Sequence, residues 1–576
     1  MKRTWLWTAL ILAASATVAQ AQAAPSAAAC PAAAPLTRGL DGALAHVRYL
    51  ADDALEGRAV GTAGERCAAE YVAAQLHALG LRPVLAGGGY VQEFPVQMGR
   101  RPAPDVALSA AGRPLTRDWA PLGFSADGVV EAPGLYAHHG WSAPGAAGAH
   151  GAQHAHDASH VPPDSATGRV AVIHVEGPMD LHRAASRAAQ RGAAAVVFVL
   201  DDAPLPDPSA ELRPRLRIPV AAARGEAGRA VQTAARAGQP VRLALRLEPV
   251  TGSGHNVAAL LPGTDAALRD EVVLVGAHLD HLGWGGSGSL APEARAVHNG
   301  ADDNASGVAA MLEIARRLAR QPPARSVLFL GFGGEERGLL GSAHYTASPA
   351  LPLENAVAML NLDMVGRLNH DALSVLGVGT AREWREVVQR ANARLAKPLQ
   401  LTLGEDGFGP SDHSSFYGRN VPVLHFFTNP HEDYHRPSDD WEKINREGLA
   451  RVIELASAVA REAAGGPRLT LVQGAGNPHG GAAMPAARGS GAYLGAMPDY
   501  AEGKDGVRIT GVRAGSPAEA AGLQVGDVLV AFDGKPIADV YAYTYALRDH
   551  NPGDVVSIEV LRAGRRLTLR ATLGER

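Results

Sequence analysis

Four short apolar runs between residues 271 and 427 constrain the fold of this chain more than any other part of its sequence. Each run is strand-like in length and composition, and helix-like segments separate the runs. They cover residues 271–277, 326–332, 356–362 and 421–427. Alternation of strands with helices predicts an α/β domain built around a largely parallel sheet.

The residues that follow these runs are of the kind that bind metals. After the four runs come, in order, His278 and Asp280, Glu335 and Glu336, Asp363, and Tyr434 and His435. Each has an ordinary explanation when taken alone, such as a helix cap or a buried histidine. Together they lie where the ligands of open α/β sheets bind, at the carboxyl ends of the strands. Carboxylates and imidazoles without thiolates suit a hydrolytic zinc site.

A glycine- and asparagine-rich segment, residues 298–307, is expected to bring one more carboxylate to the same place. It precedes a predicted helix at 308–320 and reads as a tight loop that delivers Asp303. By itself Asp303 would be a turn or cap residue. The sequence leaves open a slip of one residue, which would deliver Asp302 instead.

These motifs resemble those of the co-catalytic zinc exopeptidases, the family of bacterial leucyl aminopeptidase and aminopeptidase S, with glutamate carboxypeptidase as a relative. The resemblance is carried by His278-Leu279-Asp280, residues 300–307, Glu335-Glu336, residues 361–364 and Tyr434-His435, in the family's order. It implies a phosphorylase/hydrolase-like α/β domain, with a mixed, largely parallel sheet flanked by helices.

The resemblance also implies the metal ligands. Two Zn²⁺ ions per chain would be bridged by Asp303. His278 and Asp363 would complete one site, and Glu336 and His435 the other. Two metals roughly 3.5–4 Å apart need such a bridging carboxylate.

Three catalytic roles follow from the same resemblance. Glu335 would be the general base, which takes a proton from the attacking water and passes it to the leaving amine. Asp280 would orient the imidazole of His278. Tyr434 matches a position that hydrogen-bonds the tetrahedral oxyanion in some members. Asp412, in a loop that also resembles the family, would either tune the metal site or fix its loop.

The implied activity is that of a metallo-aminopeptidase acting on peptide substrates. A carboxypeptidase is an alternative, because metal ligands do not determine which peptide end is bound. A glutaminyl-cyclase-like enzyme with one zinc is another, and a non-catalytic binding protein on the same fold is a third.

The N-terminus predicts export. Lys2 and Arg3 precede an apolar stretch at residues 5–18, and small residues suited to signal-peptide cleavage follow. This stretch is shorter than the roughly 20 residues of a membrane span. We therefore expect a secreted or periplasmic protein in which Cys30 and Cys67 could form a disulfide.

Composition adds further limits. At 576 residues the chain is expected to hold two to four domains. Its net charge of −4 does not indicate the basic surface with which proteins bind nucleic acid. A membrane span is not expected. The expected units are a signal peptide at 1–23, peptidase segments at 38–118 and 250–465, a β-rich protease-associated-like insert at 119–249, a linker at 466–487 and a PDZ domain at 488–576.

Two of these predictions concern accessory regions. The histidine-rich stretch at 138–160 reads as a flexible insert with incidental histidines, or as a loose metal-binding tract. In the PDZ-like unit, Tyr493-Leu494-Gly495 stands in place of the usual carboxylate-binding loop. A peptide C-terminus could add there as a strand.

Overall fold

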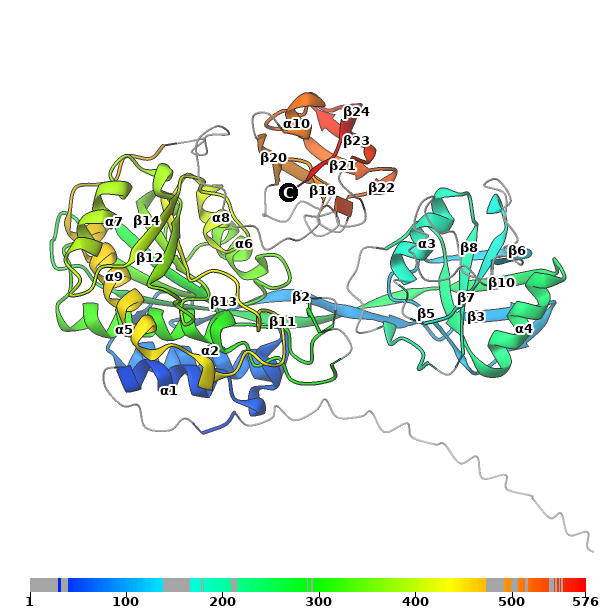
Figure 1. Cartoon of the computed structure of the whole chain (residues 1–576), viewed down its shortest axis with the longest axis horizontal. Coiled ribbons are helices and arrows are strands. Elements are labelled where there is room, and N and C mark those ends of the chain that lie inside the picture. The colour runs from blue at the N-terminus through cyan, green and yellow to red at the C-terminus, as the bar shows by residue number, and fades with distance from the viewer. Residues whose placement is uncertain are drawn as a thin grey trace, which may run out of the picture.

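The computed structural model of the chain describes residues 30–32, 40–137, 166–472 and 492–575, with short breaks at 178, 180, 202, 209–214, 287, 292–293, 499–505, 513–515, 538–542, 544–545, 548–549 and 551–552. The expected signal peptide, the histidine-rich stretch and most of the expected linker lie outside these residues. Three units can be followed in Figure 1, each with its own sheet.

The largest unit is an α/β domain around a nine-stranded sheet. Its strand order is β1-β11-β13-β12-β14-β17-β15-β16, and β2 pairs with β11. The strands are β1 (Arg82–Pro83), β2 (Val91–Pro102), β11 (Leu247–Leu261), β12 (Val272–His278), β13 (Ser326–Phe332), β14 (Ala356–Leu362), β15 (Ala372–Leu376), β16 (Gln400–Gly404) and β17 (Val423–Phe427). The four predicted runs are thus four neighbouring strands, and the predicted α/β class is confirmed.

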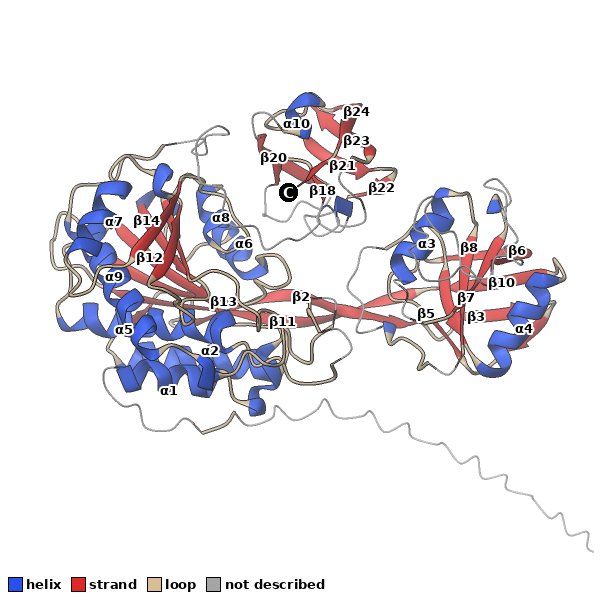
Figure 2. Cartoon of the chain, in the orientation of Figure 1, coloured by secondary structure: helices blue, strands red, loops and turns tan. Residues whose placement is uncertain are grey.

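Helices cover both faces of this sheet (Figure 2). They are α1 (Leu40–Leu50), α2 (Ala63–Ala78), α5 (Gly307–Arg320), α6 (Leu340–Ala347), α7 (Trp384–Ala393), α8 (His413–Tyr417) and α9 (Arg446–Gly465). Alternate residues of β12 enter different cores. Val273 and Val275 pack with α1, α2, α5, α7 and α9, whereas Leu274 packs with α6 and α8. Burial on both faces explains why the four runs are apolar throughout.

The order of the central strands creates the site. β13, β12, β14 and β17 are mutually parallel, so their carboxyl ends lie along one edge. The chain runs from β12 to β13 on one side and then to β14 on the other side of β12. Connections that leave in opposite directions open a crevice at the carboxyl ends, which is where ligands bind in such sheets.

The second unit is inserted between β2 and β11. Its eight-stranded sheet has the order β4-β3-β10-β6-β7-β8-β9-β5, with two helices. The elements are β3 (Ala107–Ala110), β4 (Arg113–Leu115), β5 (Trp119–Pro121), β6 (Gly128–Ala137), β7 (Val170–Val175), α3 (Leu181–Gln190), β8 (Ala195–Leu200), β9 (Val220–Ala223), α4 (Gly225–Arg236) and β10 (Pro240–Leu245). The insert was expected to begin at residue 119. β3 and β4 lie before that residue and pair into the sheet of the insert.

A two-stranded ribbon joins the insert to the first unit. β2 and β11 stay paired from Val91↔Val257 to Pro102↔Leu247, and Figure 1 shows this ribbon running between the two sheets. The far half of β2 therefore pairs with β11 outside the α/β core.

The C-terminal unit is a small β domain. Its main sheet has the order β19-β20-β21-β23-β24, with β22 beside β21 and a separate β18–β25 pair. The elements are β18 (Ala492–Tyr493), β19 (Ala496–Pro498), β20 (Val507–Val512), α10 (Pro517–Ala520), β21 (Val528–Phe532), β22 (Lys535–Pro536), β23 (Val555–Arg562), β24 (Arg565–Thr572) and β25 (Gly574–Glu575).

Near the N-terminus, Cys30 and Cys67 form a disulfide with Cα atoms 5.3 Å apart. The sequence left this pairing open. It ties residues 30–32 to α2. Among the described residues, no helix is both long and apolar enough to span a bilayer.

Candidate metal centre

Side chains from five segments meet at the carboxyl edge of the central strands. His278 is the last residue of β12, and Asp363 directly follows β14. Glu335 and Glu336 lie in the loop after β13. The remaining two are Asp303, in the irregular turn η4 (Ala301–Ser306) before α5, and His435, in the loop after β17. All five predicted metal ligands are therefore brought to one place.

The first cluster consists of His278, Asp303 and Asp363. The Nε2 atom of His278 lies 3.3 Å from Oδ1 of Asp303 and 3.3 Å from Oδ1 of Asp363. The other oxygen of Asp363 accepts a 2.7 Å hydrogen bond from Ser411. Three buried donor atoms at such separations can hold one metal ion.

The second cluster uses the other oxygen of the same aspartate. The Nε2 atom of His435 lies 3.2 Å from Oδ2 of Asp303 and 3.2 Å from Oε2 of Glu336. Its Nδ1 donates a 2.9 Å hydrogen bond to the carbonyl of Gly288. A backbone acceptor on one ring nitrogen fixes the other as a ligand. Asp303 therefore presents one oxygen to each cluster.

A fourth residue at the second cluster, His281, was missed by the sequence reasoning. Its imidazole is fully buried, and Nδ1 lies 2.6 Å from Oε1 of Glu336 and 3.9 Å from Oδ2 of Asp303. Its Nε2 has no hydrogen-bond partner in the described part of the chain. The shorter distance is that of a hydrogen bond, so Nδ1–H orients Glu336. A second histidine three residues after His278 is the pattern that could have shown it.

The neighbouring Asp302 turns away from both clusters. Its carboxylate accepts hydrogen bonds from the N–H of Gly366 at 2.6 Å and from Ser306 at 2.9 Å, and it lies 3.1 Å from Nε2 of His431. Asp439 accepts the backbone N–H groups of both Asp302 and Asp303. Asp302 therefore anchors the loop, and Asp303 is the aspartate that faces the clusters.

Asp280 holds the glutamate loop more directly than it holds His278. Its carboxylate accepts the N–H groups of Glu335 at 3.0 Å and Glu336 at 3.4 Å. Nδ1 of His278 lies 3.2 Å from the Asp280 carbonyl and 3.8 Å from its carboxylate. Orientation of His278 thus comes mainly from the backbone of Asp280. Burial, with a contribution from the charge of Glu336, raises the pKa of Asp280 to about 8.

Glu335 and Tyr434 lie beside the clusters. Oε2 of Glu335 is 4.0 Å from Nε2 of His278, farther than the oxygens of Asp303 and Asp363. The ring of Tyr434 stacks on that of His435 with centroids 3.9 Å apart. Burial and then the charges of Asp303 and Glu336 raise the pKa of the Tyr434 phenol, so it stays a hydrogen-bond donor at neutral pH.

Burial and the close approach of several charged groups shift the pKa values of the side chains in the site. Burial raises the pKa of Glu335 well above 4.5, and the charges of Asp363 and Glu336 add to this although His278 opposes it. Burial lowers the pKa of His435, but the charges of Glu336 and Asp303 outweigh burial and raise it to about 11. The metal-free chain therefore compensates its carboxylates with protonated histidines.

Divalent cations, when bound, would take over the charge compensation that the protons on these histidines provide. The donor set of three carboxylates and two imidazoles, without a thiolate, comes from Asp303, Glu336, Asp363, His278 and His435. Nitrogen and carboxylate oxygen donors of this kind suit zinc. The residues present therefore fit the metal that the sequence motifs imply.

A buried arginine underlies the two loops that carry His278 and Asp303. The side chain of Arg58 is 1% exposed and donates to the carbonyls of Leu279 at 2.9 Å, Asn299 at 2.7 Å and Gly300 at 3.1 Å. It also donates to the carbonyl of Leu50. The guanidinium links the end of β12 to the start of the bridging loop. Nothing in the spacing around Arg58 predicted this.

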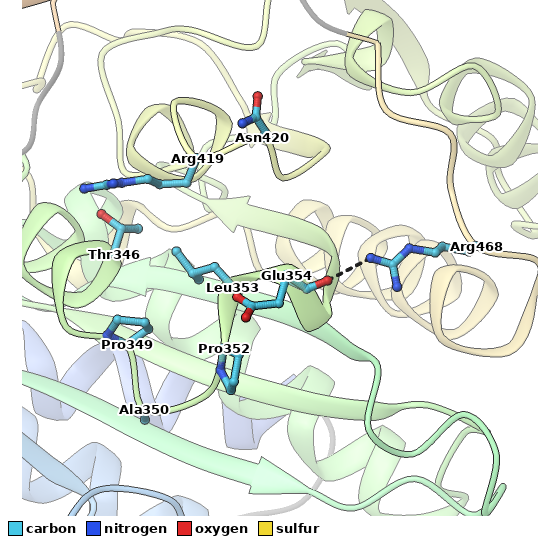
Figure 3. Close-up of a pocket in the computed structure, with 10 residues that line it drawn as sticks. Thr346, Pro349, Ala350, Pro352, Leu353, Glu354, Arg419, Asn420 and Arg468 are labelled. Carbon is cyan, nitrogen blue, oxygen red and sulfur yellow. Dashed lines mark hydrogen bonds between the residues drawn. The ribbon is translucent and has the colours of Figure 1, made fainter.

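The cavity drawn in Figure 3 is separate from this centre. It has a volume of about 820 Å³ and lies at the amino end of β14, where Arg468 donates to the Glu354 carbonyl at 2.9 Å. The metal cluster follows the carboxyl end of the same strand. Seven residues at about 3.3 Å each separate the two by roughly 20 Å.

Comparison with known proteins identifies two of the units. Residues 256–460 match the model of Peptidase family M28. This part of the chain is similar to that family and is called the M28 domain below. Residues 492–573 match the model of the PDZ domain, so the predicted C-terminal PDZ domain is confirmed.

Relatives and a solved structure match between 36% and 76% of the chain. Aminopeptidase YwaD of Bacillus subtilis is 30% identical over 312 residues, which cover 52% of this chain and 63% of that protein. The uncharacterized protein YfbL of Escherichia coli is 27% identical over 242 residues, covering 36% of this chain and 70% of its own length. A solved zinc aminopeptidase from Bacillus subtilis, BSAP, covers 76% of this chain and 99% of its own, with 24% identity and a TM-score of 0.48.

Proposed function

We propose that the chain is an exported metallo-aminopeptidase that binds two zinc ions and releases N-terminal residues from peptides. His278 and Asp363 hold one ion, and Glu336 and His435 hold the other. Asp303 bridges them. The observation that carries this proposal is the placement of the two Asp303 oxygens, 3.3 Å and 3.2 Å from histidines of different clusters.

The chemistry follows from the residues around the clusters. Zinc, when bound, lowers the pKa of water and polarises the scissile carbonyl. Glu335 takes the proton of the attacking water and passes it to the leaving amine, a task for which a carboxyl with a raised pKa is suited. Tyr434 donates its O–H to the developing oxyanion. Asp280 keeps Glu335 and Glu336 in place through their N–H groups.

Export is supported by the disulfide. The predicted signal peptide at 1–23 lies outside the described residues, but the bond between Cys30 and Cys67 is of the kind that persists in oxidising compartments. A secreted or periplasmic location fits both features. The bond places an anchored segment directly after the proposed cleavage region.

The accessory units extend the proposal. The insert is a protease-associated-like domain, and we include β3 and β4 in it because they pair into its sheet. The PDZ domain receives a peptide C-terminus as an added strand, held by the loop at 493–495. Both units present or select peptides for the M28 domain.

The test combines one variant with a substrate panel. Zinc content, and hydrolysis of aminoacyl peptides and their N-terminally blocked counterparts, are measured with and without a chelator. Glu335→Gln is expected to lower kcat by about 10²–10⁴-fold and to keep its zinc. Glu354→Gln, at the cavity of Figure 3 by the amino end of β14, is the matched control with wild-type turnover.

Any other outcome would contradict part of the proposal or favour one of its alternatives. Full activity of Glu335→Gln would contradict the assignment of the base. Equal cleavage of blocked peptides would indicate a carboxypeptidase or endopeptidase. One zinc per chain with cyclisation of N-terminal glutamine would indicate the cyclase alternative. Absence of turnover on the whole panel would favour a binding protein.

A further inference from the structure

The loop made of residues 282–286 and 288–291, here called the rim loop, exposes two large apolar side chains, and its backbone contacts His435 of the second cluster. Trp284 is 59% exposed and Leu290 is 54% exposed. Every other large apolar side chain that is comparably exposed in the described residues lies in the insert or the PDZ domain, such as Val129 and Val525. In the M28 domain such exposure is thus confined to one loop, and grouped exposed apolar residues mark contact surfaces.

The rim loop is held firmly at its base. Ser289 and the fully buried His298 are joined by a 2.8 Å hydrogen bond between Oγ and Nε2. The N–H of His298 donates to the carbonyl of Gly283, and the N–H of Gly283 donates to the carbonyl of Gly57. Trp284 and Leu290 are therefore exposed on an anchored backbone. Their contact surface is preorganised, which lowers the entropic cost of binding.

The same loop touches a proposed metal ligand. His435 donates from Nδ1 to the carbonyl of Gly288 and accepts the N–H of Leu290 at its own carbonyl, both at 2.9 Å. Nε2 of His435 lies 3.2 Å from Asp303. Leu290 is thus one backbone hydrogen bond away from the second cluster. Its side chain is more than half exposed to solvent.

We propose that the rim loop selects the residue that follows the scissile bond, favouring peptides with a large apolar side chain at that position. This inference rests on the proposed aminopeptidase activity. The N-terminal residue of an aminopeptidase substrate is enclosed at the metals, whereas the rest of the peptide leaves toward solvent. Side chains that are more than half exposed on the rim therefore meet the departing part of the peptide. Apolar contact there removes both surfaces from water.

The test compares four tripeptides, Leu-Phe-Ala, Leu-Ser-Ala, Leu-Phe-Gly and Ala-Phe-Ala, on the full-length zinc-loaded protein. The ratio of kcat/KM for Leu-Phe-Ala over Leu-Ser-Ala is expected to fall about tenfold in the variant Trp284→Ser/Leu290→Ser, mainly through KM. Val129→Ser, an equally exposed valine on the insert, is the control that keeps the wild-type ratio. Zinc content is measured for each variant.

The outcomes separate this inference from the proposed function. If the wild type hydrolyses none of the four peptides, the proposed function fails. If the wild type is active and the Phe/Ser ratio of the double variant stays the same, the rim-loop inference alone fails. A change confined to Leu-Phe-Ala over Ala-Phe-Ala would assign the loop to the N-terminal residue and overturn the proposal. An equal loss on all peptides with loss of zinc would show that the loop acts through His435, and would also overturn it.

Discussion

Replacement of Arg58 by lysine probes how firmly the N-terminal segment holds the metal centre. The guanidinium donates to four backbone carbonyls, those of Leu50, Leu279, Asn299 and Gly300, and is 1% exposed. Burial lowers its pKa to about 10, so it remains charged at neutral pH. Lysine keeps the charge, but its three N–H groups leave from one atom and do not reproduce the guanidinium fork.

The expected loss can be worked from these contacts. An ammonium in place of the guanidinium reaches about two of the four carbonyls, and each buried carbonyl left without a donor costs about 1.5 kcal/mol. The free energy of unfolding of the M28 domain should therefore fall by about 3 kcal/mol. With an m-value of about 3 kcal/mol per M in urea, the midpoint falls by roughly 1 M.

Urea unfolding of the chelated protein measures this shift. The fully buried Trp384 in α7 reports on the M28 core through its fluorescence. Arg394→Lys is the control, because that guanidinium is 67% exposed and lies 3.6 Å from Glu462. Equal midpoints for Arg58→Lys and the control would refute the reasoning. It would mean that the loops of His278 and Asp303 hold their positions without the arginine.

Three further outcomes are expected. Asp303→Asn should lower the zinc content at both sites at once, measured by atomic emission, because one carboxylate serves both clusters. His281→Phe should weaken zinc binding about 10–100-fold in chelator competition, since Glu336 loses its 2.6 Å partner. In the PDZ domain, burial lowers the pKa of His550, but its hydrogen bond to Asp533 outweighs burial and raises the pKa above 6.5. Its stabilisation is complete below pH 6.5 and is lost as pH rises through the folded pKa, so wild type and His550→Gln should differ in PDZ melting temperature at pH 5.5 and converge by pH 8.5.

The catalytic sheet was predictable because its strands are buried on both faces. The runs that became β12, β13, β14 and β17 are continuous and apolar, and their parallel order puts the following residues along one edge. That argument needs no long-range information beyond the sheet itself. It placed His278, Glu336, Asp363 and His435 along that edge, whereas Asp303 and the division of the ligands between two sites were implied by the family resemblance.

The missed parts depend on contacts that leave no local pattern. Arg58 reaches carbonyls more than 200 positions away, and any residue type can supply a carbonyl. Gly288 acts on His435 through its backbone in the same way. Asp303 was preferred to Asp302 through the family resemblance, and the contacts that occupy the Asp302 carboxylate, from Ser306 and Gly366, became visible only in the structure. Periodicity and motif spacing contain no trace of these pairings.

The ribbon of β2 and β11 has a consequence for the order of folding. During synthesis the residues of β2 emerge long before their partners in β11, and the whole insert lies between them. The insert holds every strand of its own sheet and can close it first, whereas β1 and β2 must wait for residues beyond 247. Closing so long a loop costs entropy before its contacts form. Assembly of the α/β core therefore has to follow the emergence of the whole insert, and so does formation of the metal clusters at the edge of its sheet.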